Sequence, residues 1–94
     1  MKMYRTSDNF LLREIGGESI LVPVGDAGVL SNSMISMNET SSFLWKHFQT
    51  PHTLQEVTAE AMKIYSGPAD VIEREIIEFT EAYVKAGLLK EESE

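Results

Sequence analysis

The side chains in this sequence that could do chemistry are two histidines, several serines and a late set of carboxylates. His47 and His52 are the only histidines. They flank a predicted helix end, whereas two zinc ligands on a helix share one face four residues apart. No third ligand is spaced to complete a metal site. We therefore predict no metal, and we interpret His47 as a residue that the helix dipole favours near a C-terminus.

The serines and carboxylates form no catalytic pattern either. None of the serines between residues 31 and 42 sits in a nucleophile elbow. No glycine-rich loop opens a helix after a strand, as a phosphate cradle would. Carboxylate pairs such as Glu73 with Glu75 are explained by a solvated helix face. The sequence therefore predicts neither an enzyme nor a bound cofactor.

The charge of the chain argues against nucleic acid as a partner. With 15 acidic residues against 8 basic ones, the net charge is −7, whereas a domain that binds DNA phosphates needs the opposite balance. Many of the acids fall between Asp70 and Glu94. They indicate either a solvated helix face or a surface that attracts a basic partner segment.

Length and composition indicate a small globular domain. We predict one domain over residues 1–94, with an ordered core over 10–90 and flexible ends at 1–8 and 91–94. A chain with 43% hydrophobic and 24% charged residues is typical of a folded domain. Without cysteine it has no disulfide or thiol chemistry. Because neither a signal segment nor a membrane span is present, we expect a cytoplasmic protein.

The N-terminal part of the chain predicts three antiparallel strands. Residues 10–15 and 18–24 are apolar runs joined by Gly16-Gly17, a strong hairpin signal. A third strand follows between residues 29 and 37, with Ile35 and Met37 as its core pair. The stretch 28–34 is either part of this strand or a loop.

A first helix follows the third strand with almost no linker. Asn38 is a preferred N-cap residue, and we predict a helix from Glu39 to about Phe48. Helical spacing directs Phe43, Leu44 and Phe48 toward the core. We expect Trp45 to point away from them, either capping the hairpin or partly exposed.

Two further helices complete an α+β architecture. Thr53 and Glu56 have the spacing of a capping box, which begins the second helix. Pro68 suits the first turn of a third helix, which ends near Ala86 before a cap at Gly87. Three strands followed by three helices predict a small sheet packed against a helical trio.

The third helix carries two apolar stripes. The first is the obvious core contact and comprises Ile72, Ile76, Phe79 and Tyr83. The second lies more than about 90° away and comprises Ile77, Val84 and Leu88, with Glu73 and Thr80 beside it. Either both stripes are buried against two neighbours, or the second lines a partly open groove. An edge strand beside such a groove can receive an extended peptide.

Several segments together resemble the PqqD-like family, named for coenzyme PQQ synthesis protein D. The resemblance covers roughly residues 10–90, and its most specific part is the Asn38-Glu39-Thr40 junction. The segments that carry it are "GESILVPVGDAG", "MISMNETSSFLWKHF", "HTLQEV" and "EFTEAYVKAGLL". We interpret the junction itself as a cap and anchor between sheet and helix.

The resemblance implies a winged-helix-like fold and a role as a recognition element for ribosomally made, modified peptides. Such proteins are not catalysts; they bind the leader segment of a precursor peptide and present it to an enzyme, often a radical SAM protein. In the family, the leader adds as a strand beside the third strand and the third helix. Carried onto this chain, the peptide-binding residues are Asn32, Ser33, Met34, Ile35, Ser36, Met37, Glu73, Ile77, Thr80 and Val84.

Two alternatives remain open at this point. A winged-helix DNA-binding or transcription-linked module would need an exposed basic helix face, and the acidic segment 69–94 argues against it. A dimeric structural subunit would use the same edge strand and apolar stripe to pair with a second copy.

Overall fold

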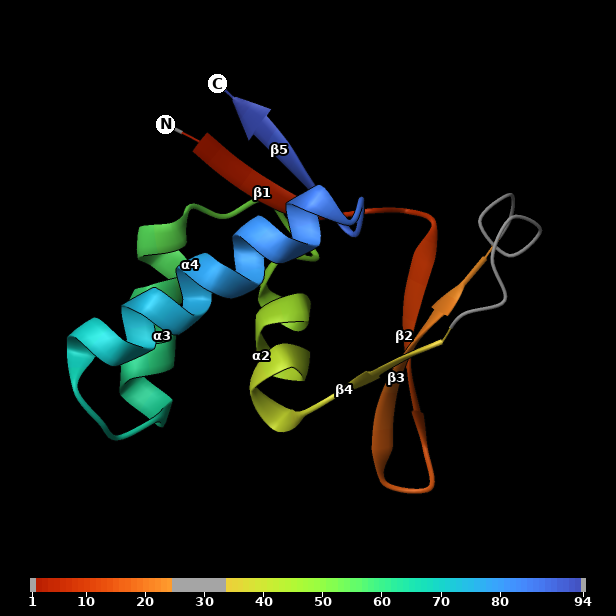
Figure 1. Ribbon diagram of the computed structural model, residues 1–94, viewed down its shortest axis with the longest axis horizontal. Helices are drawn as coiled ribbons and strands as arrows, with labels where there is room; N and C mark the ends of the chain where they lie inside the picture. The colour runs from red at the N-terminus through yellow and green to blue at the C-terminus, as the bar shows by residue number, and fades with distance from the viewer. Residues whose placement is uncertain (1, 25–33, 94) are drawn as a thin grey trace.

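The computed structural model describes residues 2–24 and 34–93 of the chain (Figure 1). A three-stranded sheet stands on one side of the helices, and a second, two-stranded sheet joins the two ends of the chain (Figure 1). The elements in order are β1 (Lys2–Thr6), β2 (Phe10–Ile15), β3 (Glu18–Pro23), β4 (Ile35–Met37), α2 (Glu39–His47), α3 (Leu54–Ile64), α4 (Ala69–Lys85) and β5 (Leu89–Ser93).

The three-stranded sheet has the order β2-β3-β4 and is antiparallel throughout. Gly16 and Gly17 join β2 to β3 with φ angles of 60° and 84°. A two-residue turn with positive φ at both positions matches the right-handed twist of the strands, and glycine adopts it without a steric cost. The predicted hairpin is confirmed.

The third predicted strand is confirmed in its last part. Ile35 pairs with Leu21 and Met37 pairs with Ser19, and the Met37 side chain is buried while Ser36 between them is exposed. This alternation is that of a strand with one buried face. Met34 precedes the strand, and residues 29–33 of the prediction lie outside the described residues.

The helices begin and end where the sequence predicts. The Asn38 side chain accepts the N–H of Ser41 at 2.8 Å, so it caps α2 as expected. Pro68 directly precedes α4. After α4 the chain turns at Gly87, whose φ of 81° is in the left-handed region that ends many helices.

A reciprocal capping box holds the start of α3. The N–H of Glu56 donates to the Thr53 hydroxyl at 3.1 Å, and the Glu56 carboxylate accepts the N–H of Thr53 at 2.8 Å. That second hydrogen bond holds the pKa of Glu56 below its ordinary value of 4.5. The stability that it contributes is therefore present above pH 4.5 and is lost as the pH falls through the lowered pKa.

Removing the cap should weaken the fold in a pH-dependent way. Thr53→Ala is expected to lower the free energy of unfolding by about 1 kcal/mol, because an N–H at the start of α3 loses its partner. In Glu56→Ala, the free energy of unfolding should also fall less steeply as the pH is lowered below 4.5. Urea unfolding at a series of pH values measures both effects. An acid loss as steep in Glu56→Ala as in the unaltered chain would contradict this assignment.

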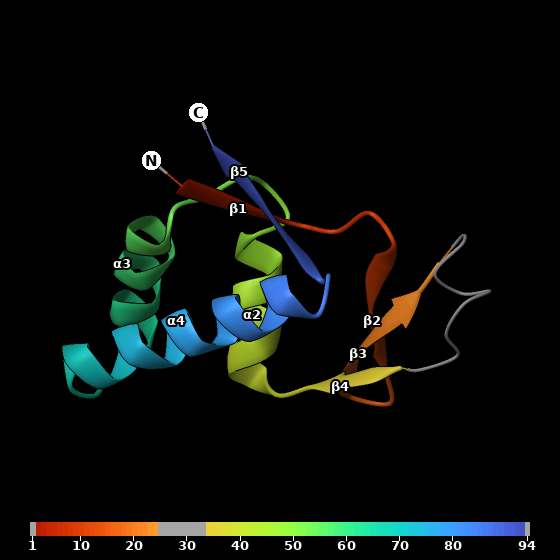
Figure 2. The same cartoon turned by 45° about the horizontal axis from the view of Figure 1, so that its top comes forward.

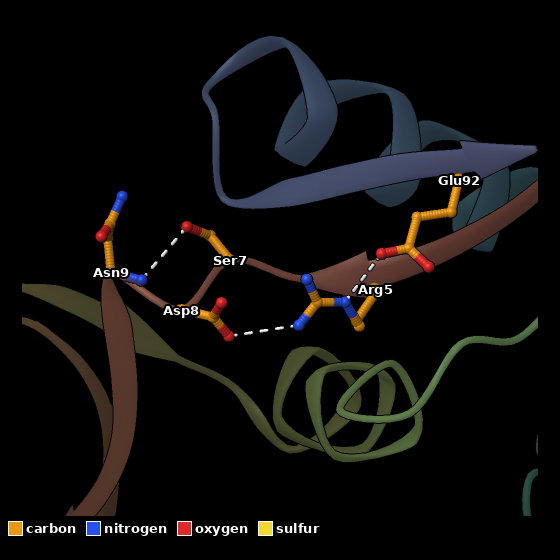
Figure 3. A network of polar contacts seen from close by, with 5 residues as sticks. All are labelled: Arg5, Ser7, Asp8, Asn9 and Glu92. Atoms are coloured by element: carbon orange, nitrogen blue, oxygen red, sulfur yellow. Dashed lines mark hydrogen bonds and ion pairs between the residues drawn. The ribbon is translucent and has the colours of Figure 1, made fainter.

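Both ends of the chain are paired, which corrects the prediction of flexible ends. β1 and β5 form an antiparallel ladder from Lys2 opposite Ser93 to Thr6 opposite Leu89. The Arg5 guanidinium joins the two strands by an ion pair with Glu92 at 2.9 Å, and it also contacts Asp8 at 3.2 Å (Figure 3). The stretch that was expected to fray is therefore a strand as far as Ser93. Residues 1 and 94 lie outside the described residues.

The core forms where the helices meet the two sheets. Its buried apolar members are Leu21, Met37, Leu44, Trp45, Phe48, Val57, Ala61, Ile76, Leu88 and Leu89. Leu44 and Phe48 are buried as predicted. Trp45, by contrast, is only 1% exposed, so the expectation that it points away from the core is wrong. It packs at the centre because α4 crosses α2 and brings Tyr83 edge-on to the indole, with ring centroids 6.5 Å apart.

Candidate functional site

β4 is an edge strand. It pairs with β3 on one side, and within residues 2–24 and 34–93 no strand pairs with its other side. Among the described residues, the backbone N–H and C=O groups along that edge have no strand partner, and such groups can bind another extended chain. The strand is short and runs straight into α2, so the Asn38 cap fixes its direction relative to the helices.

α4 lies next to this strand. The Tyr83 hydroxyl donates to the Met37 Sδ at 3.2 Å, which links the C-terminal half of the helix to β4. Phe79, one turn earlier, stacks on Tyr83 with ring centroids 3.9 Å apart. Figure 2 shows α4 crossing α2 toward the three-stranded sheet, of which β4 is an edge strand. The structure thus brings an open strand edge and an aromatic helix face together.

The face of α4 that continues from Phe79 carries two small side chains. Ala82 and Ala86 follow at intervals of three and four residues, which places them on the same side of the helix. Both alanines are exposed and Phe79 is half-buried. Small side chains let a backbone approach a helix closely, and the aromatic ring offers apolar area to its side chains. This arrangement can bind an extended peptide between β4 and α4.

The helix residues predicted from the sequence lie elsewhere. Glu73 and Ile77 line a hollow of about 670 Å³ whose other walls come from α3 and β1. Thr80 and Val84 line another hollow, of about 300 Å³, again with residues of β1 and with Leu54 at the start of α3. Thr80 itself is only 1% exposed. The structure therefore turns these four residues toward α3 and β1, and it does not bring them beside β4.

The strand residues predicted from the sequence divide into three groups. Asn32 and Ser33 lie outside the described residues. Met34 and Ser36 are exposed, with 63% of Met34 open to solvent. Ile35 is half-buried and Met37 is buried, both on the core face of β4. A peptide at the edge of β4 would therefore meet backbone groups chiefly and the exposed side chain of Ser36.

Four residues on the side of α4 that contacts β4 through Tyr83 were not predicted as site residues from the sequence. Phe79 and Tyr83 were assigned to the core stripe, and both do pack against the core. Ala82 and Ala86 carry no pattern of their own. Their angular position on the helix could have indicated them. Ala82 and Ala86 flank the core stripe on the side opposite Ile77 and Val84.

The Tyr83 hydroxyl gives this region a measurable alkaline response. Burial raises its pKa above the ordinary value of 10.0, and the Ser41 side chain acts in the opposite direction. Stability from the neutral hydroxyl is thus fully present below pH 10 and is lost as the pH rises through the raised pKa. Tyr83→Phe should lose less stability than the unaltered chain between about pH 9 and 11. Identical urea-unfolding profiles over that range would contradict the burial of this group.

Two other features were sought in the described part of the chain, a metal site and a membrane-spanning helix. Residues 2–24 and 34–93 hold no group of three or more histidine, aspartate or glutamate side chains that could bind a metal ion. Within the same ranges, no helix has the length and apolar character needed to cross a bilayer.

Two solved structures share the fold. The structure of TbiB1 in complex with the TbiA(beta) leader peptide aligns with a TM-score of 0.75, covering 96% of this chain and 99% of that one at 18% identity. The structure of lasso peptide synthetase B1 complexed with the leader peptide aligns with a TM-score of 0.74, covering 93% and 96% at 13% identity. No curated protein matches the chain.

The fold defines the class, and the sequence defines the family. An antiparallel three-stranded sheet followed by three helices makes this a winged-helix-like α+β domain. The family described as Coenzyme PQQ synthesis protein D (PqqD) matches residues 18–89. The chain belongs to this family, and the resemblance found in its sequence is confirmed.

Proposed function

We propose that this protein binds the leader segment of a ribosomally synthesised precursor peptide and presents it to a maturation enzyme, for example a radical SAM protein. It performs no chemistry itself. The leader adds as a strand to the open edge of β4, and its side chains on one face rest against α4. The protein acts in the cytoplasm, where such precursors are made.

The open edge of β4 beside the aromatic face of α4 carries this proposal. Strand addition needs an unpaired edge for backbone hydrogen bonds and a neighbouring apolar surface for alternate side chains. The edge is unpaired in the described residues, and the Met37–Tyr83 contact keeps α4 against the strand. Both solved structures that share the fold contain a leader peptide, which supports the same role here.

The strand residues of the sequence prediction, from Met34 to Met37, fit this site. For the helix we propose Phe79, Ala82, Tyr83 and Ala86 in place of the stripe that contains Ile77, because that stripe faces α3 and β1. The proposed contacts give selectivity through shape and apolar area, since none of these four side chains carries a charge.

The rival functions are less well supported. A DNA-binding module has to place a basic surface against phosphate, and this chain has a net charge of −7. A dimer through β4 would occupy the edge that the leader needs, so self-association and leader binding should compete.

Fluorescence anisotropy with labelled peptides tests the proposal. The probes are synthetic peptides that tile the short, precursor-like reading frames beside the gene, together with a DNA duplex and the labelled protein itself. Saturable binding of one peptide, unchanged by moderate salt, is the expected result. Binding only to DNA with a steep salt dependence, or only to a second copy of the chain, would overturn it.

A further inference from the structure

A second surface of the molecule lies between the hairpin and α3. It is an open hollow of about 920 Å³, also lined by residues of α2, the helix that lies between the hairpin and α3 in both views (Figures 1 and 2). The turn end of the β2–β3 hairpin forms one wall, and the last turn of α3 forms the other. Ser36 and Met37 of β4 also line it, so the hollow borders the strand proposed for the leader, whereas α4 contributes no residue to its lining.

Apolar and aromatic side chains line the part of the hollow between α2 and α3. Phe43 packs edge-on against Tyr65 with ring centroids 5.6 Å apart, and both are half-buried. Ile64 beside them is 62% exposed, which is unusual for a large aliphatic residue at a helix end. Exposed apolar side chains that lie together in this way mark surfaces where another protein binds.

Carboxylates stand around this apolar surface. Glu14, Glu18 and Glu39 all line the hollow, and Lys46 is its one basic residue. Lys46 is already engaged, because its Nζ lies 3.2 Å from a carboxylate oxygen of Glu14. Among the described residues, Glu18 and Glu39 take part in no ion pair. The hollow therefore keeps two negative charges next to exposed aromatic and aliphatic area.

We infer that this hollow binds a basic segment of a second protein, one that places Lys or Arg side chains next to a large apolar residue. The cations would meet Glu18 and Glu39, and the apolar residue would cover Ile64 and the Phe43–Tyr65 pair. Aromatic faces also attract Lys and Arg directly. We assign this partner as the enzyme that receives the peptide. Only this assignment of the partner rests on the proposed function; the binding surface itself does not. Such an enzyme has to dock while the leader occupies the edge of β4.

Two model peptides test the charge and the place of this surface. One alternates Lys or Arg with Leu or Phe, and its counterpart carries Glu and Asp in place of the basic residues. We expect the basic peptide alone to bind, with amide NMR shifts concentrated at 14–19, 36–46 and 64–65. Changing Glu18→Gln and Glu39→Gln together should weaken it about tenfold, as expected for the loss of two exposed ion pairs.

A matched pair of substitutions controls for the change in net charge. Asp70→Asn with Glu78→Gln removes two exposed carboxylates of α4 that do not line the hollow, and it should alter the affinity by less than about twofold. Equal binding of the acidic peptide would overturn the inference. Amide shifts outside the lining of the hollow, or an equal loss of affinity in the two double variants, would overturn it as well.

The leader peptide separates this inference from the proposed function. Protein saturated with a leader should still bind the basic peptide, because Glu18, Glu39 and Ile64 lie on β3, α2 and α3 and not on β4. Displacement of the basic peptide by the leader would place the hollow within the leader site and overturn the assignment to a second protein. Failure of every leader to bind would contradict the proposed function. The titration with the basic peptide would then still decide whether the hollow binds a basic segment.

Discussion

Trp45→Ala is expected to lower the free energy of unfolding by about 3 to 5 kcal/mol, the largest effect of any single substitution considered for this chain. The indole is 1% exposed and packs against Tyr83 of α4. Its loss leaves a cavity where α2 meets α4. Because the free energy of unfolding of a small domain is only about 5 to 15 kcal/mol, much of the variant should be unfolded. Urea unfolding followed by circular dichroism measures the loss.

Two further substitutions show whether the effect comes from the indole. Trp45→Phe keeps an aromatic ring in the cavity and should cost clearly less than Trp45→Ala. Lys46→Ala changes the exposed neighbour and should stay within about 0.5 kcal/mol of the unaltered chain. A loss below about 1 kcal/mol for Trp45→Ala would show that the tryptophan does not fill the core.

Ala82→Arg is expected to weaken leader binding by at least about tenfold, equivalent to about 1.4 kcal/mol. Ala82 is exposed on the face of α4 that continues from Phe79. A long charged side chain there would occupy the face of α4 on which side chains of the leader strand are proposed to rest. Arginine is a good helix former, so the fold should be as stable as before. Peptide titration and urea unfolding of the same variant separate the two effects.

Ala59→Arg is the matched control for this experiment. Ala59 is an exposed alanine of α3, and it lines the hollow that also contains Glu73 and Ile77. The change in size and charge is identical, but it falls on the other side of α4. Leader affinity should stay within about twofold of the unaltered chain. A strong loss in Ala59→Arg with none in Ala82→Arg would place the leader against the stripe of Ile77, as the sequence alone predicted.

The elements that the sequence predicted correctly are those that local chemistry determines. Gly16-Gly17 specifies a tight turn, Asn38 caps α2, and Thr53 with Glu56 caps α3 through contacts within a few residues. Such features need no knowledge of how the elements pack.

The features that the sequence analysis missed depend on contacts between distant residues. The ladder of β1 with β5 joins opposite ends of the chain, and the ends are too polar to carry a strand pattern. The burial of Trp45 follows from the crossing of α4 over α2. The same crossing decides which side of α4 meets β4, so helical spacing identified two apolar faces but could not tell which one adjoins the strand.

Amide hydrogen exchange in β4 tests the central claim most directly. Strand addition gives the free edge of β4 new hydrogen-bond partners, so the amides of 35–37 that face this edge should exchange more slowly when a leader peptide is bound. Amide shifts should fall on the same strand and on 79–86 of α4. Saturable binding without added protection in β4, or with protection confined to α3 and β1, would contradict leader recognition by strand addition at this edge.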